Sequence, residues 1–195
     1  MSSLLAHVAA GLTLHFCRRE QQARRWHASM ALPVLLAIAP DFDYFGIWFL
    51  HLRYAQRYTH SLLFCLLLSS LVYLLAKRCW PTWNARPGFL VLSLAASSHL
   101  LLDMLVGRAL PLMWPFVDNE FFLPLAFLPG ASHTGIISYA FWRNLFMETG
   151  LLLPILAAML LLRHRWTLRA YLPEILLVLA MWSGLVCAAG KMLYT

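Results

Sequence analysis

Long apolar runs separated by short polar stretches dominate the chain from end to end. A transmembrane helix needs roughly 17–25 predominantly apolar residues, and six runs approach or reach that length. The pattern therefore predicts an all-α, polytopic membrane bundle of about six helices. These helices are expected at Ser2–Cys17, Ala28–Leu50, His60–Ala76, Phe89–Val106, Leu145–Leu162 and Leu172–Leu193.

Two interruptions change this simple picture. Pro33 and Pro40 lie inside the second run. Proline removes a backbone donor and disfavours helix in the residue before it, so we expect a kink or break around Ala39-Pro40-Asp41. Between the fourth and fifth helices, the stretch ALPLMWPFVDNEFFLPLAFLPGASHTG is rich in proline and aromatic residues. It predicts a broken or re-entrant loop whose backbone must be satisfied by protein or water.

Composition supports a membrane protein and changes little else. The 195 residues are 62% hydrophobic and 12% charged, whereas a soluble domain carries about 25% charged residues. We expect one integral membrane domain over residues 1–195.

The N-terminus has no basic segment ahead of its first apolar run, which argues against a cleaved signal peptide. The cysteines form no CxxC pair, which favours buried thiols over disulfides or a zinc knuckle; they are Cys17, Cys65, Cys79 and Cys187.

The basic residues predict the orientation of the chain. Formal net charge is +7, and with six spans ten Lys and Arg residues fall on one side of the membrane and five on the other. The positive-inside rule makes the richer side cytoplasmic. Both termini then face the periplasm of a bacterial inner membrane; if the first helix does not span, the N-terminus moves inside. The basic clusters indicate topology and contact with the lipid surface, and no nucleic-acid partner is expected.

Polar residues inside the apolar runs are the main functional signal. Asp41, Asp43 and Asp103 each have a histidine within reach, and a carboxylate at mid-bilayer costs roughly 2.5–3.5 kcal/mol. His99 and Asp103 stand i, i+4, so on a helix they share a face with Cβ atoms about 6 Å apart. With the predicted topology, these residues lie at similar depth toward the outer face. The same depth holds for His7 and His60, so the sequence predicts one polar site.

The residue types suit a metal ion. Histidine nitrogen and carboxylate oxygen together bind zinc, manganese or iron, and a carboxylate can bridge two ions. Asp43 points away from Asp41 on a regular helix, so it either reaches the site through an unwound stretch or orients a histidine. Arg57 and Arg108 either clamp a substrate phosphate or fix the orientation of the chain in the membrane.

Structural hydrogen bonding between helices is the competing explanation for the cluster of histidines and aspartates. Asp118, Glu120 and His133 lie on the same side and could complete the site, although a structural role is favoured for them. For Glu148, a pairing with Arg143 or Arg108 and a catalytic role are equally compatible with the sequence.

Four segments carry a resemblance to a known family. They are LLAHVAAG, LAIAPDFDYFG, RYTHSLL and SHLLLDMLVGRALPLMWPF, and they cover about the first two-thirds of the chain. Together they resemble the motifs of the LexA-regulated, inner-membrane-associated family of metal-dependent hydrolases. That family is distantly similar to zinc-dependent phospholipase C and zinc-dependent single-strand nucleases. The resemblance implies that His7, Asp41, His60, His99 and Asp103 are metal ligands, with Asp43 a ligand or general base.

The chain also departs from that pattern. Ala55-Gln56-Arg57-Tyr58 replaces the usual His-Arg-Gly ahead of Thr59, Tyr44 stands where histidine is common, and no acid follows His133 in the register of a His-x-x-x-Glu pair. One or two ions are therefore expected rather than three. The resulting hypothesis is a zinc- or manganese-dependent hydrolase acting on a phosphoester of a membrane lipid or lipid-linked molecule at the periplasmic face. Asp43 would serve as base, and Arg57 would hold the substrate anion.

Two other classes remain open. A metal or proton transporter would need polar residues that continue to the cytoplasmic face, and the third, fifth and sixth helices offer almost none. A non-catalytic membrane scaffold would use the same histidines and aspartates only to hold its helices together. Metal content separates the scaffold from the hydrolase.

Overall fold

The computed structural model describes residues 3–18, 26–43, 50–51, 57–81, 87–124, 126–128, 138–164 and 172–194. Within these ranges the protein is helical, and the only β-type pairing is an isolated bridge between Leu110 and Phe121. The α-helices are α1 (Leu4–Phe16), α2 (Trp26–Ile38), α4 (Leu62–Cys79), α5 (Phe89–Leu105), α6 (Tyr139–His164) and α7 (Leu172–Tyr194). Two short 3-10 helices, η1 (Ala39–Phe42) and η2 (Tyr58–His60), lie beside them. The all-α prediction is confirmed.

The helices lie close to the predicted runs, with two clear differences. The second helix ends at Ile38 rather than at Leu50, because the predicted break at Pro40 stops it. α6 begins at Tyr139 rather than at Leu145. The reason is local: the hydroxyl of Ser138 accepts a hydrogen bond from the backbone N–H of Phe141 at 3.1 Å. This side chain satisfies a donor that the first helical turn leaves open. The cap allows the helix to start in the polar stretch ahead of the apolar run.

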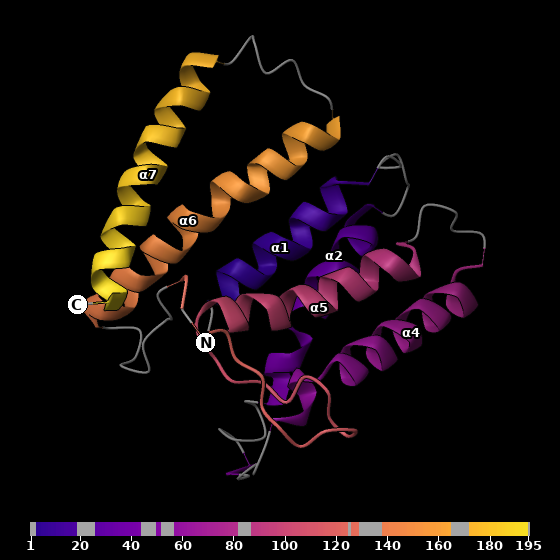
Figure 1. The fold of residues 1–195 in the computed structure, drawn as a ribbon. Helices are drawn as coiled ribbons and strands as arrows, with labels where there is room; N and C mark the ends of the chain where they lie inside the picture. The colour runs from indigo at the N-terminus through magenta and orange to yellow at the C-terminus, as the bar shows by residue number, and fades with distance from the viewer. Residues whose placement is uncertain are drawn as a thin grey trace.

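The helices form a central group with a neighbour on each side (Figure 1). α1, α2 and α5 pack against one another, and α4 packs along α5. The hairpin of α6 and α7 lies on the other side, where α6 contacts α1. Trp182 of α7 donates its indole N–H to the carbonyl of Leu151 in α6 at 3.0 Å. The first, second and fourth predicted helices therefore meet in one place, which is where the candidate ligands were expected.

A close backbone approach sets the position of α1 on α2. A Cβ atom at Gly11 would lie 2.7 Å from the Cα of Val34 and 3.0 Å from the carbonyl oxygen of Pro33. Because both neighbours are backbone atoms, neither can move aside cheaply, and glycine is required there. Small residues at helix interfaces are typical of membrane bundles. His7 stands one turn before Gly11, so the same contact brings His7 toward the end of α2.

Outward faces of the helices are strongly apolar. Residues of α4 such as Leu67, Leu71 and Leu74 are more than half exposed, whereas the core between α2, α4 and α5 contains buried small residues such as Cys65, Ala95 and Ala96. A water-soluble bundle would reverse this pattern. Lipid is the solvent that such surfaces fit.

Among the helices that the structure describes, two are long and apolar enough to cross a bilayer. They are Leu62–Cys79 and Tyr139–Arg163, and 17% of the window tested in each is buried inside the protein. Shorter apolar helices occupy Leu4–Phe16, His27–Phe42, Phe89–Leu105 and Ile175–Ala188. By length and composition these two helices are suited to a bilayer, and the sixfold span count and its orientation stay predictions.

The segment after α5 folds back over the end of that helix. Gly107 turns the chain with a φ of 82°, and the backbone N–H groups of Phe127 and Leu128 both donate to the carbonyl of Leu105. Leu110 is buried, whereas Phe116 is 80% exposed. This irregular, aromatic-rich path agrees with the broken loop that its proline content predicted.

Candidate metal centre

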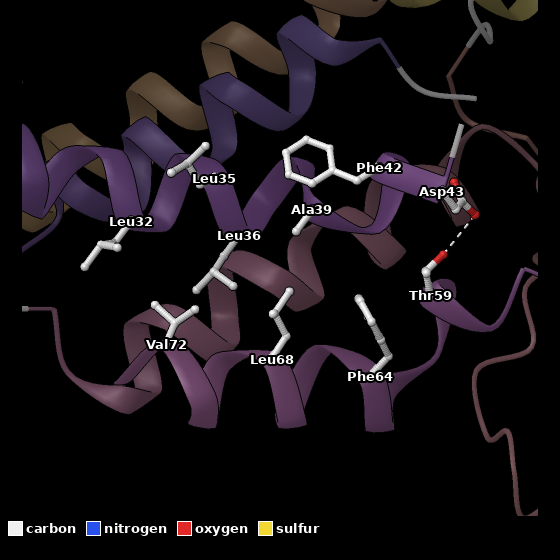
Figure 2. Close-up of a pocket in the computed structure, with 10 residues that line it drawn as sticks. All are labelled: Leu32, Leu35, Leu36, Ala39, Phe42, Asp43, Thr59, Phe64, Leu68 and Val72. Atoms are coloured by element: carbon white, nitrogen blue, oxygen red, sulfur yellow. Dashed lines mark hydrogen bonds between the residues drawn. The ribbon is translucent and has the colours of Figure 1, made fainter. Parts of the chain in front are cut away.

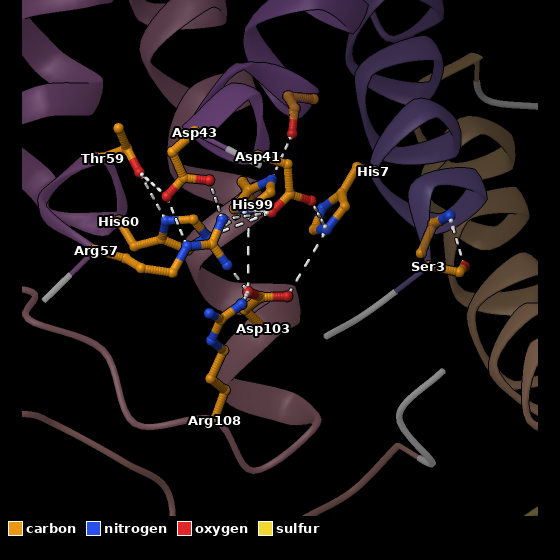
Figure 3. A network of polar contacts seen from close by, with 12 residues as sticks. Ser3, His7, Asp41, Asp43, Arg57, Thr59, His60, His99, Asp103 and Arg108 are labelled. Carbon is orange, nitrogen blue, oxygen red and sulfur yellow. Dashed lines mark hydrogen bonds and ion pairs between the residues drawn. The ribbon is translucent and has the colours of Figure 1, made fainter. Parts of the chain in front are cut away.

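The break after α2 places the first carboxylate. α2 ends at Ile38, and the chain tightens into η1 with the buried Pro40 in its first turn. Proline cannot donate to the preceding turn, so the helix loses its regular hydrogen bonding where the sequence predicted. Asp41 follows at once, and its side chain is 14% exposed. The tighter turn directs Asp41 toward α1 and α5 (Figure 3).

The start of α4 places the second contributor, His60. η2 ends at this residue, and the hydroxyl of Ser61 caps α4 by accepting from the N–H of Phe64 at 3.2 Å. The N–H of Leu62 donates to the carbonyl of Leu112 at 3.0 Å, which ties this helix start to the segment after α5. His60 is fully buried.

α1 and α5 supply the remaining ligands. His99 and Asp103 stand one turn apart on α5, and both are fully buried. The His7 ring of α1 stacks on the His99 ring, with ring centroids 3.8 Å apart. The i, i+4 reading of His99 and Asp103 is therefore confirmed, and His7 joins them.

Three imidazoles and two carboxylates converge on one point (Figure 3). The Nε2 atoms of His60 and His99 lie 3.3 Å apart. Each lies 3.5–4.0 Å from Oδ1 of Asp41 and Oδ2 of Asp103. The Nε2 atom of His7 lies 3.9 Å from Oδ2 of Asp41 and 3.8 Å from Oδ1 of Asp103. Two overlapping sets could each hold an ion: His7 with Asp41 and His99, and His60 with His99 and Asp103.

These separations fit ligands of one metal ion. Zinc binds histidine nitrogen and carboxylate oxygen at about 2.0–2.2 Å, so neighbouring ligand atoms in a tetrahedral site lie about 3.4 Å apart. The observed range is 3.3–4.0 Å. The aspartates also present different oxygens to His7 and to the other two histidines, which is the arrangement of a carboxylate that can bridge two ions.

Hydrogen bonds orient the rings of His60 and His99 so that their Nε2 lone pairs point toward the centre. The Nδ1 atom of His99 lies 2.8 Å from the carbonyl oxygen of Ala37; a carbonyl only accepts, so Nδ1 donates. Thr59 donates its hydroxyl to Asp43 at 3.0 Å, so its oxygen accepts from Nδ1 of His60, also at 3.0 Å. Metal-binding histidines are typically oriented in this way.

Burial also keeps His60 neutral. His60 precedes the α4 span, and desolvation lowers its pKa from the ordinary value of 6.5. The Asp41 carboxylate, which favours the protonated ring, opposes this shift, while Arg57 and His99 add to it. A neutral imidazole is the form that binds a metal ion.

Two arginines surround the carboxylates. Arg57 donates from Nε to Oδ2 of Asp43 at 2.6 Å and from Nη2 to Oδ1 of Asp41 at 3.2 Å; a second contact joins Nη2 to Oδ1 of Asp43. Arg108 donates to Oδ2 of Asp103 at 2.9 Å. Both arginines therefore touch the centre, and each lies where it could exchange a carboxylate for a substrate anion.

Asp43 occupies a different place from the other aspartates. It lies outside both groups of potential ligand atoms and instead contacts Arg57 and Thr59, the residue that orients His60. The structure thus favours the alternative that Asp43 orients a histidine. Its roles as ligand or base stay predictions.

The remaining candidates lie elsewhere. Glu148 is fully buried, and its two oxygens accept from the N–H of Ser3 at 2.8 and 2.9 Å, which fixes the start of α1. An acidic residue inside an apolar helix indicates a buried polar partner. The sequence suggested an arginine as that partner, whereas the partner that the structure describes is the backbone N–H of Ser3. Asp118 and Glu120 are exposed. His133, Tyr44 and Gln56 fall outside the described residues.

Known proteins place the chain in a membrane family. A family model described as YdjM inner membrane protein matches residues 1–186. Inner membrane protein YbcI of Escherichia coli (strain K12) is 30% identical over 97 residues, which is 47% of this chain. The match spans 56%, or about half, of the length of that curated relative. No solved structure matches significantly. Because the family model covers nearly the whole chain, the protein belongs to the YdjM inner membrane protein family.

Proposed function

We propose that this inner membrane protein is a metal-dependent hydrolase that cleaves a phosphoester of a lipid or lipid-linked molecule at the periplasmic face. One observation supports it most: the Nε2 atoms of His7, His60 and His99 and the carboxylates of Asp41 and Asp103 meet within 4.0 Å. Five potential ligands from four segments in one buried place are more than helix association requires.

The residues around the centre suit a phosphate ester. A bound zinc or manganese ion would supply a nucleophilic hydroxide at neutral pH and polarise the phosphoryl oxygen. Arg57 contacts Asp41 and Asp43 at the edge of the centre, and its guanidinium matches the geometry of a phosphate. When a substrate phosphate pairs with Arg57, the ion pair between Arg57 and Asp43 breaks, and the Asp43 carboxylate is then able to accept a proton. Arg108, which contacts Asp103, is the second candidate anion ligand.

The same ion pairs favour one alternative, a non-catalytic scaffold. Arg57 and Arg108 already neutralise Asp41 and Asp103 in part, so the cluster has a structural explanation that needs no metal ion. Such a protein would join α1, α2 and α5 through its polar centre and would bind no stoichiometric metal.

Hydrolysis is tested directly with purified protein. Detergent-solubilised protein loaded with zinc or manganese is incubated with vesicles of phosphatidylglycerol, or with a polyprenyl phosphate, and the products are separated by mass spectrometry. We expect head-group or phosphate release by the wild type and its loss in His60→Ala. The matched control is His27→Ala, since His27 is an exposed histidine outside the centre. Equal product formation by the wild type and by His60→Ala would contradict the proposal.

A further inference from the structure

A long apolar groove runs between α2 and α4 (Figure 2). Its volume is about 340 Å³. Aliphatic and aromatic side chains line nearly all of it, and the polar exceptions are Asp43 and Thr59. The full lining is Leu32, Leu35, Leu36, Ala39, Phe42, Asp43, Thr59, Phe64, Leu68 and Val72.

The groove lies between two helices, α2 and α4, that both pack on α5. α4 packs chiefly on α5, α2 packs on both α1 and α5, and α2 and α4 contact each other only sparingly. Side chains of both helices line the space between them. The groove is open at its edge, where Leu35 and Phe42 are each 49% exposed. In a bilayer those exposed side chains face hydrocarbon, so lipid has direct access.

One end of the groove reaches the candidate metal centre. Asp43 and Thr59 line it there. Thr59 also accepts from His60, and Asp43 contacts Arg57. An anionic group carried to this end by an apolar molecule would reach the Asp43–Arg57 ion pair, and it would displace the Asp43 carboxylate to contact the guanidinium. The opposite end, at Leu32 and Val72, is wholly apolar.

The length of the groove fits a lipid chain. Phe64 and Val72 mark its two ends along α4, and eight residues of α-helix rise about 12 Å. One leaflet of the bilayer core is about 15 Å thick, half of the roughly 30 Å total. The groove therefore covers most of the depth that a single lipid chain occupies in its leaflet.

We propose that this groove binds one hydrocarbon chain of a membrane lipid whose anionic head group lies at Arg57. The inference rests on the proposed function only for the fate of the head group; binding of the chain is independent of catalysis. It makes the substrate a membrane lipid held by its chain, drawn sideways from the bilayer, rather than a water-soluble phosphate ester.

The experiment uses metal-free protein in phosphatidylcholine nanodiscs, with a phosphatidylglycerol probe that carries a diazirine in one acyl chain. After irradiation, labelled peptides are identified by mass spectrometry. We expect labels on the faces of α2 and α4 that line the groove. Because no hydrolysis is involved, an inactive protein could still pass this test. Labels confined to the outer leucines of α4 and α7, with the groove unlabelled, would overturn the proposal.

Two variants sharpen the result. Leu68→Trp fills the groove at its middle, and overpacking of this kind should lower labelling of the groove about tenfold. Leu67→Trp is the matched control, since Leu67 is the next residue on α4, is 61% exposed and does not line the groove. Val72→Phe, at the wholly apolar end, is a second blocking variant should Leu68→Trp fold poorly. Unchanged labelling in a folded blocking variant would contradict the assignment.

The head group is tested with a second probe of identical chain. Phosphatidylcholine carrying the same diazirine should label the groove less than phosphatidylglycerol does, and Arg57→Gln should remove the difference. Equal labelling by both probes in the wild type would overturn the placement of the anionic group at Arg57. Protein–protein cross-links that replace lipid labels in the groove would identify a second chain as the occupant and overturn the lipid assignment.

Discussion

His60 and His99 face each other with their Nε2 atoms 3.3 Å apart. Each ring directs its Nδ1 atom to an oxygen of the protein, so both Nε2 atoms turn lone pairs toward Asp41 and Asp103. Two lone pairs and two carboxylates in one buried place form a donor set that a cation stabilises.

Thr59 is predicted to control metal affinity through the His60 ring. Thr59→Val removes the oxygen that accepts from Nδ1 of His60, while Thr59→Ser retains it. We expect Thr59→Val to weaken zinc binding about 10- to 100-fold, as loss of such partners does elsewhere, and Thr59→Ser to restore it. Competition with a chromophoric zinc chelator measures both. Equal affinities in Thr59→Val and the wild type would show that this hydrogen bond does not orient the ring.

Gly11 is predicted to set the depth of α1. Gly11→Ala places a methyl group against the backbone of Val34, so α1 must move away from α2, and we expect a cost of about 1–3 kcal/mol in the free energy of unfolding. Gly184→Ala is the matched control, because nothing lies within 4 Å of its Cβ position; its effect should stay within about 0.5 kcal/mol. Thermal unfolding in detergent compares the two. Similar melting temperatures would refute a tight contact at Gly11.

Stability of the metal-free protein is predicted to fall as pH decreases through the ordinary histidine range. The folded state lowers the pKa of His60 below 6.5, so the unfolded chain binds more protons between the two pKa values, and stability rises with pH in that window. Melting temperatures measured from pH 8 to pH 5 should decline on the acidic side, and His60→Asn should reduce the slope. A slope that is unchanged in His60→Asn would assign the effect to other groups.

The orientation can be tested with cysteine chemistry. Cys79 lies exposed at the end of α4, on the side that the positive-inside rule makes cytoplasmic. A membrane-impermeant maleimide applied to intact spheroplasts should leave Cys79 unlabelled and should label Glu120→Cys, which lies in the exposed segment between α5 and α6. Opened membranes should expose both. Labelling of Cys79 in intact spheroplasts would reverse the predicted topology.

Much of this arrangement follows from local sequence patterns. Apolar length predicts the helices, Pro40 predicts the break that positions Asp41, and the i, i+4 spacing predicts that His99 and Asp103 act together. These features depend on a few adjacent residues, which is why they can be inferred without a structure.

Other features depend on contacts between distant segments. Glu148 meets the N-terminus of α1 across 145 positions of the chain, and no local pattern encodes that pairing. The sequence leaves open whether Asp43 is a ligand, a base or an orienting residue, because its position depends on how Arg57 and Thr59 approach after the helix break. The start of α6 at Tyr139 depends on the Ser138 cap, which a count of apolar residues does not register.

Elemental analysis of the purified protein tests the central claim most directly. The wild type is compared with His99→Ala and Asp103→Ala, and with His15→Ala, which removes an equally buried histidine that contacts Ser29 outside the centre. We predict about one or two transition-metal ions per chain in the wild type and in His15→Ala, and loss of that metal in folded His99→Ala and Asp103→Ala. Metal-free wild type that takes up neither added zinc nor manganese would contradict a metal centre and leave the scaffold as the better account.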